Sequence, residues 1–414
     1  MATVRSRTDN PSASGARPAE PRRWRGPLLA ILGWALLAYP IVRAQLAEVG
    51  YANRVPAAAL LFDAGHARSL ASLAAATQVK GQQQQAMALA RDALAREPMN
   101  IAAARTTGLA LEQTGRGADA DRIMMLAGML GWRDVALQVW LIKAYALKED
   151  LRGALHRANA LARLDKLPQL IYPIFMGSIT DDRLRLALAQ EMADRPPWRG
   201  NFFYGILQLP PEQMPNVTKL VADLARIGSP INPAERAIYL SRLVQVGQGP
   251  AALAYWRRDQ RVASATVPWD GGFERVPPRG ALAAPFEWQL TPESTGVAAI
   301  VPGARGGQLS VSQGRDYTGA LATQTVVLRS GRYRVTAAIG GDAAATGLRW
   351  TIRCLPDQRE LAIDAGDDGS ELASAGFQVP ANCSAQSLTI DMASGGGGAG
   401  GDITVDDVVI RSIG

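Results

Sequence analysis

GQQQQAMALARDA (residues 81–93) and GRGADADRIMMLA (residues 115–127) follow one pattern with a 34-residue period. Each opens with a glycine, and small or flexible apolar residues recur at the same offsets in both stretches and again one period further on. The matched sets are Gly81 and Gly115; Ala86, Ala120 and Ala154; Ala90, Met124 and Ala158; and Ala93, Ala127 and Leu161. A turn glycine lets one helix end tightly, and small residues let the following helix approach its neighbour. The period therefore predicts helical pairs that stack, because a single pair does not bury its own apolar face.

This period resembles that of the tetratricopeptide repeat, whose unit is a helical pair of about 34 residues. Pro98 matches the proline that closes a repeat in that family, and Gly108 and Tyr145 match positions in the first helix of their repeats. Trp132 and Lys166 stand where a closing proline would be, which departs from the family pattern. The resemblance implies an extended groove that binds a protein partner, and the alternative is that the array serves only as a spacer.

A less regular helical region follows these repeats, and we assign residues 47–261 to one TPR-like helical domain. Three amphipathic helices are expected there, at residues 181–193, 216–227 and 233–246. The last of them has Pro233 at its first helical position, which is a favourable start signal.

An uncharged apolar run, residues 27–42, lies between Arg25 and Arg43. The run is short for a bilayer core of about 30 Å, so we predict a transmembrane anchor that extends over residues 27–46. The arginines before the run predict a disordered cytoplasmic leader, residues 1–26, with the rest of the chain in the periplasm of a bacterial inner membrane. A cleaved signal peptide and a buried core helix are the alternatives.

The composition changes near residue 262, where Gly, Thr, Val and Ser rise in short runs separated by turn residues. Such runs are typical of a β-sandwich, which we assign to residues 262–414. The expected fold class is therefore multidomain α + β: a transmembrane helix, a TPR-like α-helical solenoid and a jelly-roll β-sandwich. Strands are expected at residues 286–290, 296–301, 307–312, 323–328, 332–339, 348–354, 371–379, 387–392 and 403–410.

The chain has two cysteines, Cys354 and Cys383, and both lie in the predicted sandwich. Alternation along the strand at 348–354 turns Cys354 inward beside Trp350. Outside the reducing cytoplasm, two cysteines in one β domain predict a structural disulfide, and two buried free thiols are the alternative.

Three short segments of this domain resemble jelly-roll carbohydrate-binding modules: DGGFE (270–274), GRYRV (331–335) and VDDVVI (405–410). The resemblance implies that the first and last strands pair, and that acidic groups there hold a structural Ca²⁺, with Glu274 and Asp407 as its ligands. The alternative is that Asp407 only faces solvent, because two carboxylates are an incomplete ligand set.

Sugar binding in such modules needs exposed aromatic rings. Tyr317, in a predicted turn, is the best candidate for an exposed ring. Trp288 is the second candidate, although its position in a strand also suits the core. Trp350 is assigned to the core by strand alternation.

The sequence gives little support for catalysis or for nucleic-acid binding. Nucleophile-elbow, zinc-protease, Walker and Rossmann motifs are all missing, and the two histidines, His66 and His156, offer little for acid–base or metal chemistry. We therefore assign no catalytic residue and no cofactor beyond the implied Ca²⁺. The pI of 9.6 is basic, but no basic helix or aromatic-interleaved basic patch accompanies it, so no nucleic-acid partner is expected.

The order of anchor, repeat array and sandwich resembles bacterial envelope proteins associated with exopolysaccharide synthesis and export. The resemblance implies a non-enzymatic scaffold at the inner membrane, with envelope proteins as partners and polysaccharide as a further one. The main alternative is a carbohydrate-binding protein whose helices are a spacer, and a third is a carboxylate glycosidase of unfamiliar type.

Overall fold

The computed structural model describes residues 25–262, 266–275, 282–290, 297–303, 306–312, 317–341, 348–355, 357–365, 372–392 and 402–413. Of residues 25–31 and 365 only the backbone is described. Of the leader predicted for residues 1–26, residues 1–24 therefore lie outside the described residues. The chain forms two compact units, residues 1–141 and 142–414, and each is described by itself.

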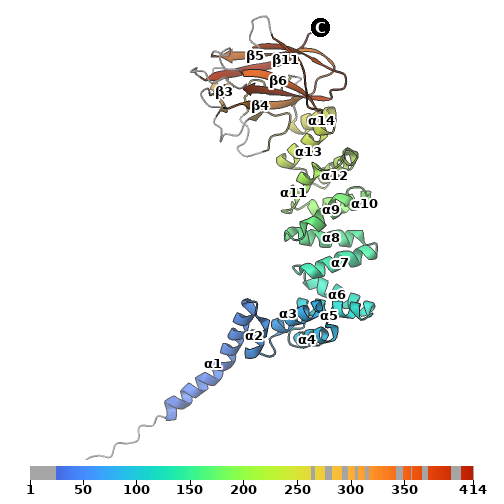
Figure 1. Ribbon diagram of the computed structural model, residues 1–414, viewed down its shortest axis with the longest axis vertical. Helices are drawn as coiled ribbons and strands as arrows, with labels where there is room; N and C mark the ends of the chain where they lie inside the picture. The colour runs from blue at the N-terminus through green and yellow to red at the C-terminus, as the bar shows by residue number, and fades with distance from the viewer. Residues whose placement is uncertain are drawn as a thin grey trace, which may run out of the picture. The chain divides into compact units, whose positions relative to one another are not determined.

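The first unit is helical, and its helices follow one another with short connections (Figure 1). They are α1 (Arg25–Ala52), α2 (Pro56–Phe62), α3 (Ala67–Val79), α4 (Gln83–Arg96), α5 (Ile101–Gln113), α6 (Gly117–Leu130) and α7 (Val135–Leu147), within which the unit ends. Among the described residues, no helix combines the length and the apolar character expected of a membrane-crossing segment.

The 34-residue period governs how helices begin in this unit. His66, Asn100 and Asp134 are spaced by this period, and each accepts a hydrogen bond from the backbone N–H three residues further on. The three acceptor–donor distances are 3.3, 3.0 and 2.9 Å. These side chains each satisfy one backbone donor that a helix N-terminus otherwise leaves unpaired.

The same period governs how the first helix of each pair ends. Gly81, Gly115 and Glu149 adopt left-handed backbone conformations, with φ of 80°, 79° and 60°. In each case the next residue donates its N–H to the carbonyl five residues before it, at 3.2, 2.9 and 2.9 Å. This is the bond of a Schellman motif, which a left-handed residue closes. Glu149 therefore occupies a place that its two predecessors give to glycine.

Replacing Glu149 by glycine is expected to raise the free energy of unfolding by about 0.5–1 kcal/mol. A side chain in the left-handed region costs roughly 1–2 kcal/mol, of which the extra chain entropy of glycine offsets part. Ala146→Gly, inside α7, is the matched control and should lower stability by about 1 kcal/mol. Chemical denaturation measures both changes, and equal losses in the two variants would contradict the assignment.

The second unit continues with helices and ends in a sandwich (Figure 1). Its helices are α8 (Leu151–Arg163), α9 (Pro168–Ser178), α10 (Asp182–Met192), α11 (Arg199–Ile206), η1 (Pro211–Gln213), α12 (Met214–Arg226), α13 (Pro233–Gln245) and α14 (Gly249–Gln260). The three helices expected after the repeats correspond to α10, α12 and α13. The predicted start at Pro233 is confirmed, and Asn232 and Glu235 form a capping box around it.

A buried ion pair joins two helices of this unit that are not consecutive in sequence, α11 and α13. Arg199 on α11 and Glu235 on α13 have side chains 2% and 5% exposed, and Arg199 Nε lies 2.9 Å from Glu235 Oε1. Arg199 also donates to the carbonyls of Met192, Ser229 and Pro230. One guanidinium thus connects the end of α10, the loop before α13 and the first turn of α13.

The β-sandwich consists of two antiparallel sheets around one apolar core. The first sheet has the order β1 (Gln289–Leu290), β4 (Gly319–Val326), β10 (Ala385–Met392), β6 (Leu348–Leu355) and β7 (Arg359–Glu360). The second has the order β2 (Ala298–Gly303), β3 (Gly306–Val311), β11 (Ile403–Ser412), β5 (Gly331–Gly340), β9 (Ser374–Val379) and β8 (Ile363–Ala365). Each of the expected strands overlaps one of these, whereas β7 and β8, of two and three residues, were not expected.

The two ends of the sandwich sequence lie side by side. Val408 and Ile410 of β11 donate their N–H groups to the carbonyls of Gly271 and Val267, at 2.9 and 2.7 Å. The carbohydrate-binding-module resemblance implied that the first and last strands pair. The residues bonded to β11 here form no strand, and the first strand, β1, pairs with β4 in the other sheet.

Candidate functional site

The apolar side chains matched by the 34-residue period lie between packed helices. Ala86, Ala90, Ala93 and Met124 are fully buried, and Gly108 lies under the Met124 side chain, where a Cβ would come within 2.5 Å of its Cγ. The other predicted packing alanines are also buried, at 5% exposure or less: Ala120, Ala127, Ala154 and Ala158.

Four predicted repeat positions lie closer to the surface, and two of them are the exposed turn residues Gly81 and Gly115. Pro98 is exposed in the connection between α4 and α5. Tyr145 is half-buried, and the Arg157 guanidinium lies over its ring, 5.9 Å from the centroid.

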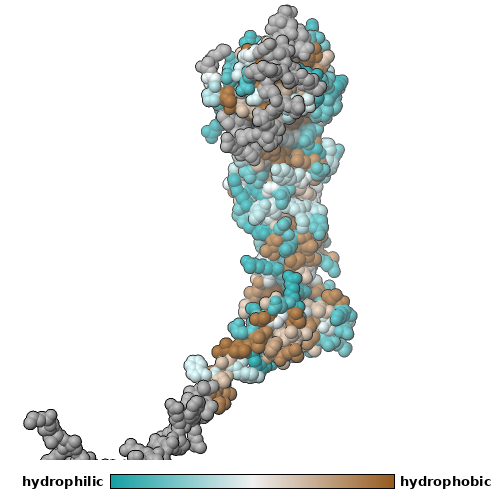
Figure 2. Space-filling model, turned by 60° about the vertical axis from the view of Figure 1, so that its left-hand side comes forward, coloured by the Kyte–Doolittle hydropathy of each residue, from teal (hydrophilic) through white to brown (hydrophobic). Residues whose placement is uncertain are grey.

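An exposed apolar surface marks the end of α6, and it is called the α6 patch here. Its members are Leu126, Met129, Leu130 and Trp132, which are 59, 62, 53 and 39% exposed. Ile101 and Leu130 line an open hollow beside it, together with Gly131, Trp132, Arg133 and Asp134. Figure 2 shows apolar residues gathered over the helices of the first unit. Clustered apolar exposure of this kind marks interaction surfaces in soluble proteins.

The rim of the α6 patch is positively charged. The Arg122 side chain, one turn before Leu126, is 79% exposed and lies 3.7 Å from Asp119, and Arg133 is also exposed. The neighbouring Asp134 carboxylate is engaged by Arg105, 3.1 Å away. The α6 patch thus offers an apolar centre with cationic edges. The repeat period predicts a binding groove but does not name its residues, although the apolar run MMLAGML (124–130) could have indicated them.

α1 exposes apolar side chains in every direction. All residues from Trp34 to Leu46 are exposed, and thirteen consecutive helical positions cover the whole circumference of a helix. The large apolar side chains among them are 40–76% exposed: Trp34, Leu36, Leu37, Tyr39, Ile41, Val42 and Leu46. A helix that is apolar on all sides needs an apolar environment on all sides.

The two predicted calcium ligands lie near the turn that opens the sandwich. A Cβ on Gly272 would lie 3.4 Å from Glu274 Oε1 and 3.7 Å from Asp406 Oδ1, so the carboxylates of Glu274 and Asp406 face the same backbone. Asp406 thus supplies a second carboxylate at this point, and Asp407 as a ligand stays a prediction. Asp407 is left-handed, with φ of 47°, and its N–H donates to Asp406 Oδ1 at 2.7 Å.

The Ca²⁺ implied by the resemblance stays a prediction, because the described residues at this turn supply only part of a calcium ligand set. Ca²⁺ takes about six to eight oxygen ligands, whereas two carboxylates face Gly272. In the described part of the chain, no three acidic, His or Cys side chains are grouped to hold a metal. The nearby Asp270 instead accepts hydrogen bonds from the N–H groups of Glu274 and Arg275, at 2.9 and 3.1 Å. Burial raises the pKa of Asp270, although these two bonds act in the opposite direction.

The aromatic rings predicted for ligand binding do not form an exposed platform. Trp288 is 3% exposed, stacks on Phe273 at 5.0 Å between ring centroids, and donates its indole N–H to the Asp270 carbonyl. Its ring belongs to the core, so it does not serve as a ligand platform. Tyr317 is half-buried against the core and donates its hydroxyl to the Ala320 carbonyl at 2.8 Å.

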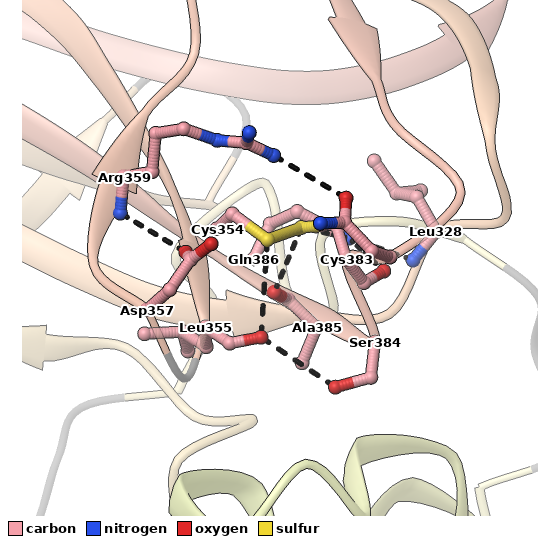
Figure 3. Close-up of a disulfide and its surroundings, with 10 residues drawn as sticks. Leu328, Cys354, Leu355, Asp357, Arg359, Cys383, Ser384, Ala385 and Gln386 are labelled. Atoms are coloured by element: carbon pink, nitrogen blue, oxygen red, sulfur yellow. Dashed lines mark hydrogen bonds between the residues drawn. A yellow bond between two sulfur atoms is a disulfide. The ribbon is translucent and has the colours of Figure 1, made fainter.

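The predicted disulfide between Cys354 and Cys383 is present (Figure 3). Cys354 lies on β6 and is fully buried, and Cys383 lies just before β10 and is 5% exposed. The Gln386 side chain, drawn beside the bond in Figure 3, donates to the Cys383 carbonyl at 3.2 Å. The bond joins residues 29 apart in sequence across two neighbouring strands.

Removing the disulfide by the double change Cys354→Ala and Cys383→Ala is expected to destabilise the sandwich by about 3–4 kcal/mol. The loop-entropy relation gives this magnitude for a closed loop of this length. Thermal unfolding with and without reductant measures it. The wild type should lose stability in reductant and the double variant should not respond, whereas equal responses would contradict the prediction.

An aromatic cluster in the second unit joins α14 to the sandwich. Trp256 is 1% exposed, and its ring lies 5.1 Å from that of Trp269 and 5.7 Å from that of Phe286. Its indole N–H donates to Glu287 Oε1 at 3.3 Å. The Arg275 guanidinium lies over the Trp269 ring, 4.7 Å from its centroid. No motif in the sequence indicated this junction.

No family model matches the chain, and no curated protein matches it. Among solved structures, it is similar to PilF of Pseudomonas aeruginosa, with 18% identity over 56% of this chain and 92% of that chain, at a TM-score of 0.19. It is also similar to a tetratricopeptide repeat protein from Parabacteroides merdae, with 11% identity over 55% of this chain and 94% of that one, at a TM-score of 0.25. Likenesses at this level carry no argument about function. The helical repeat region and the β-sandwich are assigned from the geometry of this chain.

Proposed function

We propose that this chain is a membrane-anchored, non-enzymatic scaffold that binds an envelope protein through its helical repeats. The observation that carries the proposal is the α6 patch, four large apolar side chains that are 39–62% exposed on a stacked helical pair. Leaving them in water is unfavourable by roughly 25 cal/mol per Å² of apolar area, which a bound partner recovers. The expected partner surface is apolar with an acidic edge, because Arg122 and Arg133 flank the patch.

Two further features support an anchor and an extracytoplasmic location. α1 is one continuous helix of 28 residues, and its described side chains up to Leu46 are exposed on every side before the helix meets α2. The uncharged run at 27–42 lies in this helix, with Arg25 and Arg43 at its borders. The disulfide belongs to an oxidising compartment, which for a bacterial inner-membrane protein is the periplasm.

The biological setting we propose is exopolysaccharide synthesis or export. The support for it is the order of the parts, an anchor followed by a helical repeat array and a β-sandwich, as expected from the envelope proteins that the sequence resembles. In this setting the mechanism is binding without turnover, and polysaccharide is a further partner of the sandwich.

Protein binding is better supported than the carbohydrate-binding alternative. All aromatic residues beyond residue 262 are described, and none of them is exposed: Trp269, Phe273, Phe286, Trp288, Tyr317, Tyr333, Trp350 and Phe377. Sugar recognition by stacking needs accessible ring faces. The helical repeats, in contrast, offer accessible apolar area.

A photo-crosslinking residue at Met129 in the full-length protein, expressed in its native membrane, tests the proposal. We expect a discrete protein adduct from Met129, and none from Val79, which is 87% exposed on α3 and outside the patch. Adding Leu126→Asp should reduce the adduct about tenfold or more, as loss of a central apolar contact does. Adducts of equal yield at both positions, or none at Met129, would overturn the proposed binding surface.

The location and the setting have separate tests. A reporter that is active only outside the cytoplasm, fused at the C-terminus, should be active, and activity of a cytosol-only reporter would refute the topology. Leu126→Asp in the producing strain should lower secreted polymer while the protein level stays unchanged. Val79→Asp is the matched control, and normal polymer in both strains would remove the exopolysaccharide role.

A further inference from the structure

α1 and α2 form a helical hairpin whose arms are held at two points. Near its closed end, Ala59 is fully buried against Gly50, where an added Cβ would lie 2.9 Å from the Ala59 nitrogen. Near its open end, Arg43 Nε donates to the Phe62 carbonyl at 2.6 Å. α2 therefore runs back along α1, and its last residue comes level with Arg43.

Arg43 is the first charged residue after the apolar run of α1. Its guanidinium lies over the ring of Tyr39, 5.5 Å from the centroid, and Tyr39 is 63% exposed. Tyrosine and arginine at the end of an apolar helix are typical of the level where a bilayer meets water. If α1 crosses a membrane, Arg43 marks that level.

The residues at the end of α2 point to different surroundings. Ala59 packs against α1, and Leu60 packs against the apolar cluster of α3, α4 and α5. Leu61, in contrast, is 84% exposed, and Phe62 is 38% exposed. Helix geometry separates successive residues by about 100°, so Leu61 faces away from both packed surfaces.

We infer that Leu61 and Phe62 insert into the extracytoplasmic surface of the phospholipid bilayer that α1 crosses. This inference rests on the proposed anchor. The occupant is lipid because Phe62, at the exposed end of α2, is level with Arg43 of α1, where the apolar side chains of Val42 and Leu46 are also exposed. Arg43, which is exposed, lies at this level, where phosphate groups would be.

The insertion fixes how the repeats stand above the membrane. Glu48 of α1 pairs with His66 at 3.4 Å and with Arg68 at 3.5 Å. His66 is also the N-cap of α3, so the first repeat helix starts from the hairpin itself. A helix end buried about 5–10 Å into the headgroup region would therefore hold α3 at a set height and angle.

A fluorescent label on an introduced cysteine tests the inference in the full-length protein reconstituted into phosphatidylcholine–phosphatidylglycerol vesicles. Among the described cysteines none is free, so Leu61→Cys, Val42→Cys or Val79→Cys supplies the reactive thiol. An environment-sensitive NBD group reports on each position, and a lipid with a nitroxide in the headgroup region quenches it. Val79 is the matched control, because it is 87% exposed in the same unit but lies at the far end of α3.

The expected result is a blue-shifted emission and strong quenching at positions 42 and 61, with neither at position 79. Quenching at 42 without quenching at 61 would overturn the interfacial role of α2 and leave the anchor intact. Absence of quenching at both would overturn the anchor and this inference together. Quenching at 61 without 42 would keep the lipid contact and refute the transbilayer helix. Equal quenching at all three positions would show that the label itself partitions into lipid, and it would count against the inference.

Discussion

Arg199→Ala is expected to lower the free energy of unfolding of the second unit by about 3–5 kcal/mol, because it leaves a carboxylate buried without its cation. The side chain of Glu235 is 5% exposed, so water does not replace the lost guanidinium. Three backbone carbonyls, those of Met192, Ser229 and Pro230, lose a donor at the same time. Chemical denaturation followed by circular dichroism measures the loss.

The exposed pair Arg163–Asp194 provides the matched control in the same array, with side chains 38 and 61% exposed. Arg163→Ala should cost no more than about 1 kcal/mol, since solvent screens an exposed ion pair. The double change Arg199→Met and Glu235→Gln should recover part of the loss, because the isolated charge is gone while the carbonyls stay unpaired. Equal costs for Arg199→Ala and Arg163→Ala would contradict the account.

The 34-residue period could be recognised from the sequence at some repeat positions but not at others. Glycine and alanine at the 34-residue interval could be recognised in the sequence because the packing and the turns at those positions require a small residue. The N-caps at His66, Asn100 and Asp134 keep the same interval, but three different side chains supply the acceptor, so no residue type repeats. The third helix end could not be recognised for a related reason. Glu149 repeats the left-handed backbone conformation of Gly81 and Gly115, but its side chain differs from theirs.

The sandwich was readable where alternation decides which side of a strand faces the core. Trp350, Ile352 and Cys354 are all buried, as the alternation along 348–354 predicted. The disulfide was predicted from the expected oxidising compartment together with the inward-facing position of Cys354 on its strand. Strands of two or three residues, such as β7, carry too little pattern to be recognised in a sequence.

The candidate sites were less predictable because they depend on what other elements leave uncovered. Trp288 occupies a strand position that suits either side, and the structure buries it against Phe273. The members of the α6 patch resemble core residues in sequence, and their exposure is decided by the absence of another described element over that end of α6. In the sequence, Arg199 likewise resembles a surface arginine, but the fold buries it.

Trp256→Ala is expected to cost about 3–5 kcal/mol and to divide the unfolding of the second unit into two transitions. The cost is that of truncating a large buried side chain. The division follows from position, since Trp256 is the residue of α14 that packs against Trp269 and Phe286 of the sandwich. Calorimetry of the full-length protein, with fluorescence and far-UV circular dichroism as separate probes, should show helices and sandwich melting at different temperatures.

Trp256→Phe separates packing from hydrogen bonding at this junction. It keeps an aromatic ring beside Trp269 but loses the indole N–H that donates to Glu287, so it should cost about 1 kcal/mol and leave the melting of helices and sandwich together. A double-mutant cycle of Trp256→Ala with Trp269→Ala should give a coupling of about 0.5–1.5 kcal/mol, the range for one aromatic pair. If Trp256→Ala kept helices and sandwich melting together, the aromatic cluster would not be what couples them. The contact of Gly249 with Ser384 and Ala385 would then be a further candidate, because a Cβ at Gly249 would lie 2.9 Å from the Ser384 carbonyl oxygen.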